Sequence, residues 1–287
     1  MEKYEYCETI FKERSASLYK AFSELEQDKA NAVYAIYAFV FKADDAVDVH
    51  HDLEKITTLK SQLKATFEGD PPKDDLLLLA LHDTLKKYPN TIDPYMDYLD
   101  AMRDDYYQKP IKTEDDFETY CQKVGGTIGL MLLPVIASKN IKKKEKELKH
   151  IVSELGKGMQ ITSILRDVRD DLMNRRVYFA DEVIAKQQLE IEITRTGLVT
   201  PEWRSTVEYY IDLAKEKYQV FYEHAGLFDD DAIYPVYLAA RYYESVMDII
   251  QKKNYTNINK QHSISKLKQF FIRRQVKHTL HKEGLIK

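Results

Sequence analysis

The chain has 287 residues, of which 44% are hydrophobic and 31% charged, with a formal net charge of −4 at pH 7. Nine glycines and eight prolines are few for this length, which excludes collagen, low-complexity disorder and turn-rich β folds. The charge gives no basic excess for binding nucleic acid, and the two cysteines, Cys7 and Cys121, provide neither a disulfide framework nor a cysteine zinc site, as suits a cytoplasmic protein.

The first third of the chain is expected to be helical with one clear loop. Residues 1–68 contain no glycine or proline and consist mainly of helix formers. Gly69 and the prolines at 71 and 72 mark a loop over residues 68–73. Asp74 and Asp75 follow as an N-cap and a first-turn acid, so a helix is expected over residues 76–81.

The later helix signals place a capping residue in front of a helical pattern. In chain order they are Thr113 with Asp116, a capping box that opens the helix carrying Tyr120 to Gly129, then Thr200 before Pro201, and residues 229–231 before Pro235. The lysine-rich residues 142–149 indicate a solvated helix face. No segment alternates as a strand, repeats at a short period or has the composition of a linker. We therefore expect a single all-α domain over residues 1–287.

The two longest apolar runs, residues 32–41 and 128–137, are far shorter than the ~20 residues that span a bilayer. We expect both to be buried core, and the N-terminus has no signal-peptide pattern.

A phosphate-binding loop and a nucleophile elbow are absent. The closely spaced glycines at 125, 126 and 129 and at 156 and 158 lie in helical patterns and indicate close helix packing.

Two helical stretches each contain the pattern Asp-x-x-x-Asp. In the first, Tyr37, Phe41, Asp44 and Asp48 share one stripe at about 100° per residue, and the surrounding residues are apolar. The first helix is therefore expected inside the protein.

The second stretch has one polar stripe beside an apolar one. The polar stripe consists of Gln160, Ser163, Asp167 and Asp171, and the apolar one of Ile161, Ile164, Leu165 and Val168.

Carboxylates directed into a core cost several kcal/mol each unless they are paired or metal-bound. No lysine or arginine is spaced to neutralise them within either stripe. Two such faces opposite one another would hold Mg²⁺ around a diphosphate, because Mg²⁺ prefers a few carboxylates together with water and phosphate oxygens. The alternative is that each pattern is an ordinary surface feature.

The Asp44–Asp48 and Asp167–Asp171 stretches resemble the first and second aspartate motifs of the squalene/phytoene synthase family, and they occur in the same order along the chain. The resemblance extends from about Arg14 to about Lys260. The other landmarks are Ser15-x-Ser17, Tyr120-Cys121 before Gly125-Gly126-Thr127, the continuation of the second motif to Tyr178-Phe179, and residues 239–243. The length is most similar to that of the bacterial dehydrosqualene synthases.

The resemblance implies the isoprenoid synthase helical bundle with a central apolar cavity. It also implies a prenyltransferase that condenses two farnesyl diphosphates head to head through presqualene diphosphate, early in carotenoid biosynthesis, without NADPH. Two or three Mg²⁺ ions would act with the substrate diphosphate. The implied metal ligands are Asp44, Asp48, Ser163, Asp167 and Asp171; the implied catalytic residues are the four aspartates and Tyr120; the implied substrate contacts are Arg14, Ser15, Ser17, Tyr37, Gln160, Arg166, Tyr178, Tyr243 and Lys260.

Three positions depart from the family pattern. Ser163 stands where asparagine is usual, Phe41 where arginine is usual, and Lys260 at a later arginine position. Phe41 puts one diphosphate contact in doubt, and the neighbouring Lys42 lies about 100° away around the helix. Asp104 and Asp105 resemble a weaker landmark, with a solvated helix end as the alternative.

Two alternatives remain open from the sequence. One is a phytoene synthase that uses geranylgeranyl diphosphate; the other, from a different class, is a catalytically inactive helical assembly factor of the same fold.

Residues 261–287 carry seven Lys or Arg and one acid, Glu283. These residues are expected either to pack as a last helix with a solvated basic face or to dock on the inner face of the plasma membrane. The oligomeric state is left open.

Overall fold

The computed structural model describes residues 2–286, and every regular element in that range is a helix. This confirms the all-α fold class. The first six helices are α1 (Glu2–Arg14), α2 (Ala16–Phe22), α3 (Gln27–Asp48), α4 (Leu53–Glu68), α5 (Leu76–Lys87) and α6 (Asp93–Tyr106). The remainder of the chain forms α7 (Glu114–Cys121), the π-helix η1 (Gln122–Gly126), α8 (Thr127–Ile136), α9 (Ile141–Met173), α10 (Asp181–Lys186), α11 (Ile191–Arg195), α12 (Pro201–His224), the 3-10 helix η2 (Ala225–Leu227), α13 (Asp230–Lys252), the 3-10 helix η3 (Thr256–Ile258) and α14 (Lys266–Lys282).

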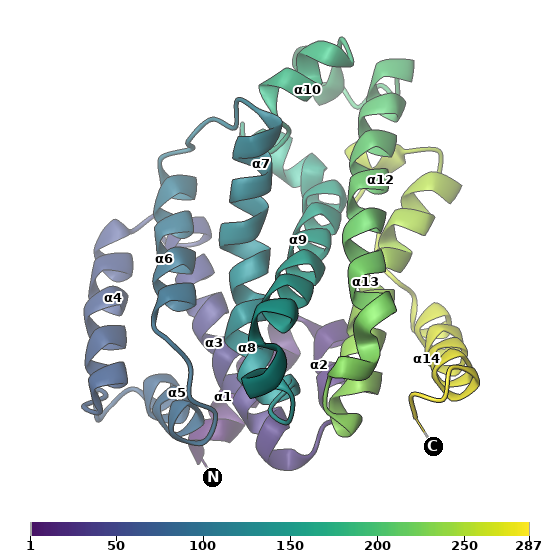
Figure 1. Ribbon diagram of the computed structural model, residues 1–287. Coiled ribbons are helices and arrows are strands. Elements are labelled where there is room, and N and C mark those ends of the chain that lie inside the picture. The colour runs from purple at the N-terminus through teal and green to yellow at the C-terminus, as the bar shows by residue number, and fades with distance from the viewer. Residues whose placement is uncertain (1, 287) are drawn as a thin grey trace.

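Helices α3, α8 and α9 lie at the centre of the bundle (Figure 1). Helices α4, α5 and α6 flank them on one side, and α12 and α13 on the other, with α14 at the outer edge. The apolar run at residues 32–41 is buried almost throughout within α3, and most of residues 128–137 are buried in α8. In the described part of the chain, no helix combines the length and apolar character needed to cross a bilayer.

The expected helix starts are confirmed, with one change. Asp75 alone caps α5, since its side chain accepts a hydrogen bond from the Leu78 backbone N–H at 3.1 Å. Thr113 and Asp116 form the complete capping box of α7. The Thr200 hydroxyl accepts from the Trp203 backbone N–H at 3.1 Å. At Gly69 the φ of +96° ends α4, a conformation that favours glycine.

Close glycine contact brings η1 and α8 against α9. A Cβ atom built on Gly125 would lie 2.1 Å from the backbone oxygen of Gly156, and one built on Gly129 would lie 2.2 Å from that of Val152. Only glycine allows the two backbones to approach this closely. The pairs 125–156 and 129–152 also show that α8 and α9 run antiparallel, so Ile136 lies far from the C-terminal end of α9.

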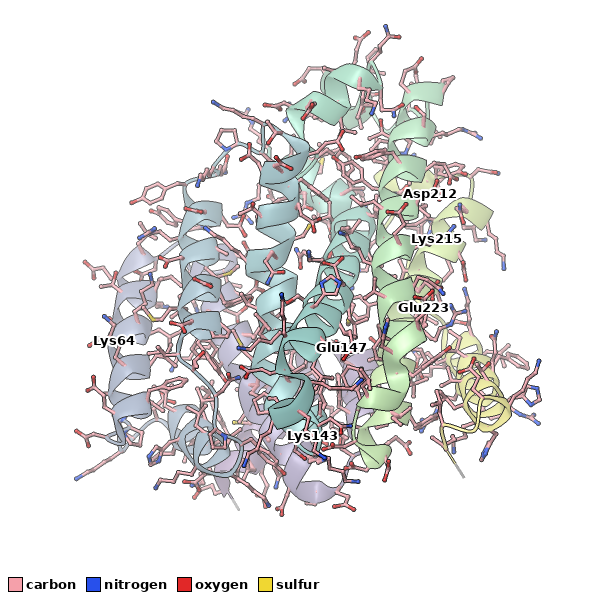
Figure 2. The ribbon with its side chains drawn as sticks, viewed as in Figure 1. Lys64, Lys143, Glu147, Asp212, Lys215 and Glu223 are labelled. Atoms are coloured by element: carbon pink, nitrogen blue, oxygen red, sulfur yellow. The ribbon has the colours of Figure 1, made fainter. Side chains whose placement is uncertain are left out.

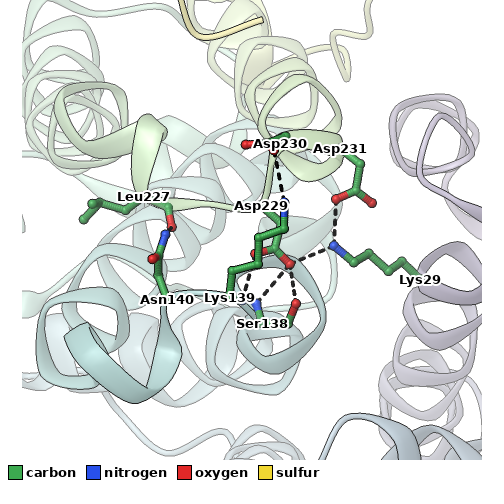
Figure 3. A network of polar contacts seen from close by, with 8 residues as sticks. All are labelled: Lys29, Ser138, Lys139, Asn140, Leu227, Asp229, Asp230 and Asp231. Carbon is green, nitrogen blue, oxygen red and sulfur yellow. Dashed lines mark hydrogen bonds and ion pairs between the residues drawn. The ribbon is translucent and has the colours of Figure 1, made fainter.

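Asp229 stands at the N-cap position of α13, and its buried carboxylate joins three segments (Figure 3). It accepts hydrogen bonds from the backbone N–H and hydroxyl of Ser138 and from the backbone N–H of Lys139. Lys29 of α3 pairs with Asp229 at 2.8 Å and with Asp231 at 2.7 Å. The expected loop and helix start at residues 229–231 are confirmed, but the Asp229 side chain caps no N–H of α13.

Charged side chains cover the outer surfaces of the bundle (Figure 2). Lys64 on α4, Lys143 and Glu147 on α9, and Asp212, Lys215 and Glu223 on α12 are all exposed. Residues 142–149 form the solvated helix face expected from the sequence, apart from the buried Leu148.

Candidate active site

Helices α3 and α9, which carry the two acidic motifs, line the same cavity. Tyr37 of α3 and Gln160 and Ser163 of α9 line one apolar cavity. The charges of the two helices also interact, because Asp48 contributes to raising the pKa of Asp171. The structure therefore brings together the two faces that the sequence pattern singles out.

Asp44 has its cationic partner on another helix. Arg14, the last residue of α1, lies 3.2 Å from a carboxylate oxygen of Asp44 and 2.9 Å from one of Asp45. Its guanidinium carbon is 5.5 Å from the ring centroid of Phe41. Lys42 turns away and pairs with Asp75 at 2.5 Å. The cation beside Asp44 thus comes from Arg14.

Asp48 pairs with Arg176, which follows the end of α9, at 2.5 Å. The Arg176 side chain is mostly buried and lines a polar cavity of about 270 Å³ with Tyr120 and Tyr178. The rings of Tyr120 and Tyr178 stack with centroids 5.2 Å apart, and the Tyr120 hydroxyl donates to Asp105 at 3.2 Å. The expected site tyrosines therefore lie beside the first acidic motif.

Asp167 is held by its neighbour Arg166 through two hydrogen bonds of 2.9 and 2.6 Å. Gln261 donates a further hydrogen bond to the same carboxylate. The Arg166 guanidinium carbon is 5.7 Å from the centroid of the Tyr243 ring. Asp171 forms no side-chain hydrogen bond or ion pair with any other residue from 2 to 286.

Three carboxyl groups at this end of the bundle have raised pKa values. Burial, followed by the charge of Asp48, raises the pKa of Asp44 to about 7. Burial, followed by the charge of Asp167, raises the pKa of Asp171 to about 8. Burial likewise raises the pKa of Asp105 to about 7. Negative charge is therefore in excess here, and a cation or a hydrogen-bond donor would be stabilised.

The donor set fits Mg²⁺. Carboxylate and hydroxyl oxygens are the ligands that this ion prefers, and it usually keeps water and phosphate oxygens for its remaining positions. The oxygens available are those of Asp44, Asp48, Ser163, Asp167 and Asp171. Within residues 2–286, no three His, Cys, Asp or Glu side chains converge closely enough to form a complete metal site of their own. Water and phosphate oxygens would fill the remaining positions around the ion.

An apolar cavity of about 100 Å³ begins beneath the aspartates. Its polar lining is limited to Tyr37, Gln160, Ser163 and Tyr243, and its apolar lining is Leu18, Phe22, Ile128, Leu132, Ile136, Val152, Leu155, Met159, Val236 and Ala239. Small-molecule pockets usually measure roughly 300–1,000 Å³, so two long chains would enter only if lining side chains moved. Met159 is the most adaptable of them.

Three of the expected substrate contacts are less closely tied to this centre. Ser15 stands at the N-cap position of α2 and Ser17 in its first turn, and both are partly exposed. Lys260 is exposed and has no side-chain hydrogen bond or ion pair with any other residue from 2 to 286. The residue that reaches Asp167 from this segment is Gln261.

Arg176 and Gln261 are missing from the set expected from sequence, and Asp105 was only a weak candidate. Arg176 lies five residues after Asp171, beyond the end of the helix, and that proximity is the one signal the sequence offered. For Gln261 no local pattern existed, because its contact with Asp167 joins residues 94 apart. Asp105 is partly buried and accepts the Tyr120 hydroxyl, so a site role for it stays a prediction.

Comparison with known proteins gives a consistent result. The family model for squalene/phytoene synthase matches residues 11–271. The chain is 29% identical over 285 residues to 4,4'-diapophytoene synthase of Staphylococcus haemolyticus, covering 96% of each protein. It is 28% identical over 265 residues to 15-cis-phytoene synthase of Synechococcus elongatus, covering 88% of this chain and 85% of the relative. A crystal structure of a dehydrosqualene synthase in complex with ligand superposes with a TM-score of 0.92 at 30% identity, over 98% of this chain and 97% of the other.

Proposed function

The chain belongs to the squalene/phytoene synthase family, and from that premise we propose that it is a dehydrosqualene (diapophytoene) synthase. It would condense two farnesyl diphosphates head to head, through presqualene diphosphate, and release the hydrocarbon without reduction by NADPH. One observation carries the proposal: two acidic helix ends, with arginines supplied from other segments, lie one to two helical turns beyond Tyr37 and Ser163, which line an apolar cavity. The names of the diapophytoene and dehydrosqualene synthases that this chain resembles support the choice of substrate.

The polar end of the site would bind the diphosphates. Mg²⁺ held by Asp44, Asp48, Ser163, Asp167 and Asp171 would stabilise the negative charge of a departing diphosphate. The guanidinium groups of Arg14, Arg166 and Arg176 would bind phosphate oxygens in their forked geometry. Ser15, Ser17, Gln160 and Lys260 are proposed as further polar contacts.

The apolar end would protect a carbocation. Breaking the C–O bond of the first substrate gives an allylic cation, which attacks the double bond of the second and loses a proton to form a cyclopropyl diphosphate. Loss of the second diphosphate, rearrangement and loss of another proton then give the hydrocarbon. Tyr37 and Tyr243 line this cavity and would exclude water. Tyr120 and Tyr178 line the polar cavity, where their ring faces would attract positive charge. No side chain has to act as a nucleophile, and the released diphosphate can accept the protons.

A phytoene synthase that uses geranylgeranyl diphosphate is the second candidate, favoured by the similarity to 15-cis-phytoene synthase. An inactive helical assembly factor is disfavoured because Arg14 supplies a cation beside Phe41, where the sequence pattern lacks its arginine. Both active alternatives share the polar end of the site, so the length of the prenyl chain distinguishes them.

The test is incubation of the purified protein with farnesyl or geranylgeranyl diphosphate, Mg²⁺, and NADPH present or absent. We expect dehydrosqualene from farnesyl diphosphate whether or not NADPH is added, and no product after chelation of the metal. Squalene formed only with NADPH would contradict the dehydrosqualene assignment. Phytoene as the preferred product would favour the second candidate, and no diphosphate release from either substrate would favour the assembly factor.

A further inference from the structure

Helix α14 lies along the outer edge of the bundle and packs mainly on α13 (Figure 1). Its inward side chains are Ile272, Val276 and Leu280, all buried. At about 100° per residue they fall on one side of the helix. The opposite side of the helix carries exposed side chains.

That outer side carries three large apolar side chains in its first half. Leu267 is 67% exposed, Phe270 53% and Phe271 58%. Together with Arg274 they lie within an arc of about 100°, and the guanidinium of Arg274 sits 5.8 Å from the Phe270 ring centroid. A soluble surface rarely places so many large apolar groups together without a partner. We call these four residues the α14 outer face.

Cations flank the α14 outer face on both sides. At about 100° per residue, Lys266 and Lys277 lie on one edge and Lys282 on the other. Helix α14 itself contains six Lys or Arg and no Asp or Glu. Of the remaining cations, Arg273 pairs with Glu24 and Lys268 is partly buried and donates to the Ser245 carbonyl. The unpaired positive charge is therefore concentrated around the exposed apolar groups.

We propose that the α14 outer face docks the protein on an anionic lipid bilayer, with Leu267, Phe270 and Phe271 entering the headgroup region. Helices that lie in the membrane–water interface typically expose Phe and Leu side chains flanked by Lys and Arg. Each Lys or Arg near an anionic surface adds to the attraction, which salt screens. A second copy of this chain fits less well, because the same basic face would meet itself across a symmetric contact.

Vesicle sedimentation with the full-length protein, in the absence of substrate, tests whether the α14 outer face binds an anionic bilayer. We expect binding to vesicles of phosphatidylcholine containing about 30% phosphatidylglycerol to exceed binding to pure phosphatidylcholine by on the order of tenfold or more at low salt, and to fall at high salt. The apolar variant is Leu267→Ser with Phe271→Ser, and the charge variant is Lys266→Gln with Lys282→Gln. Both change exposed side chains, so circular dichroism and the melting temperature should stay unchanged.

Matched controls use exposed residues elsewhere. Met173→Ser with Leu198→Ser removes two large apolar groups that are as exposed as those on α14, and Lys64→Gln with Lys215→Gln removes two exposed cations (Figure 2). The α14 variants should each lose on the order of tenfold in vesicle binding, and the controls should bind as the parent does.

Three results would overturn the proposal. The first is equal binding to neutral and anionic vesicles at low salt. The second is loss of binding in the Met173/Leu198 variant while the α14 variants still bind, which would place the membrane contact elsewhere. The third is a dimer in sedimentation velocity that the α14 apolar variant dissociates, with no vesicle binding by the parent, which would assign the face to a second copy.

Discussion

The guanidinium of Arg14 lies against the ring of Phe41 and within 3.2 Å of the Asp44 carboxylate. Arg14 belongs to α1, whereas Phe41 and Asp44 belong to α3, and the aromatic ring holds the cation beside the acid by a cation–π contact. The arrangement places at Asp44 the positive charge that the sequence of α3 alone does not provide.

Replacing Arg14 by glutamine should therefore lower kcat/KM by at least about tenfold, since a charged contact to phosphate is worth about 1.5–3 kcal/mol. Lys42→Gln is the matched control, because Lys42 is the adjacent cation on α3 but pairs with Asp75 instead. Adding Phe41→Arg to the Arg14→Gln variant should restore part of the activity. Equal losses in the Arg14 and Lys42 variants would contradict a specific role for Arg14.

Asp44→Ala or Asp167→Ala should lower turnover by at least ~10²-fold, because several kcal/mol of leaving-group stabilisation depend on the metal ligands. Asp170→Ala is the control, since Asp170 is next to Asp171 on α9 but points about 100° away from it and is exposed. Diphosphate release measured at matched folding, with Mg²⁺ varied, is the readout. Near-normal turnover in either motif variant would rule out the proposed metal site.

Ile136 lies at the end of the apolar cavity away from the aspartates, so Ile136→Ala should lengthen the space for a prenyl chain. The ratio of activity with geranylgeranyl to that with farnesyl diphosphate should rise by roughly tenfold, the lower end of what one methylene in an apolar pocket is worth. Leu133→Ala removes a buried side chain of the same helix that does not line the cavity. The ratio separates a change of specificity from the loss of stability that both variants share; an unchanged ratio would place the chain terminus elsewhere.

The buried Asp229 should make stability depend on pH. Burial by itself would raise the pKa of Asp229, but Lys29, Ser138 and the Lys139 N–H outweigh it and hold the pKa below its ordinary value. The folded state thus favours the ionised form, so this stabilisation is complete above the unfolded pKa of about 3.9 and is lost as the pH falls through the lower folded value.

Asp229→Asn should accordingly cost about 2–4 kcal/mol at neutral pH, since it leaves Lys29 with a weaker partner in a buried setting. The difference from the parent in denaturant unfolding should shrink as the pH drops below about 4. Asp230→Asn is the control, because Asp230 is exposed and only pairs with Lys139 at the surface. A difference that persists undiminished in acid would show that the carboxylate charge is not the cause.

The two acidic helix faces of the candidate site could be predicted from sequence because their signals are local. The i, i+4 spacing places Asp44 with Asp48, and Asp167 with Asp171, on one face of a helix, and capping patterns such as Thr113 with Asp116 identified helix starts. The same holds for the glycines at 125 and 156, whose helical context predicted close packing.

Arg166, the partner of Asp167, is its neighbour in the sequence. The pairings of Asp44 and Asp48 with arginines could not be predicted from sequence, because these contacts are not local. Arg14 meets Asp44 across 30 residues, and Arg176 meets Asp48 across 128. Such pairs depend on how helices are placed in three dimensions, and no periodicity within one helix encodes that placement. The volume of the apolar cavity likewise depends on side chains from α2, α3, α8, α9 and α13 together.

The π-helix η1 joins α7 to α8 without a break. The resulting continuous helix lines both cavities. Tyr120, before η1, lines the polar cavity, whereas Gly125 within it and Ile128 beyond it line the apolar one. A π turn holds an extra residue and so rotates the faces on either side of it relative to each other. Removing one residue from 122–126 would restore α-helical phase and turn Tyr120 about 100° with respect to Ile128. The extra residue of the π turn therefore fixes how the residues that line the polar cavity are oriented relative to those that line the apolar cavity.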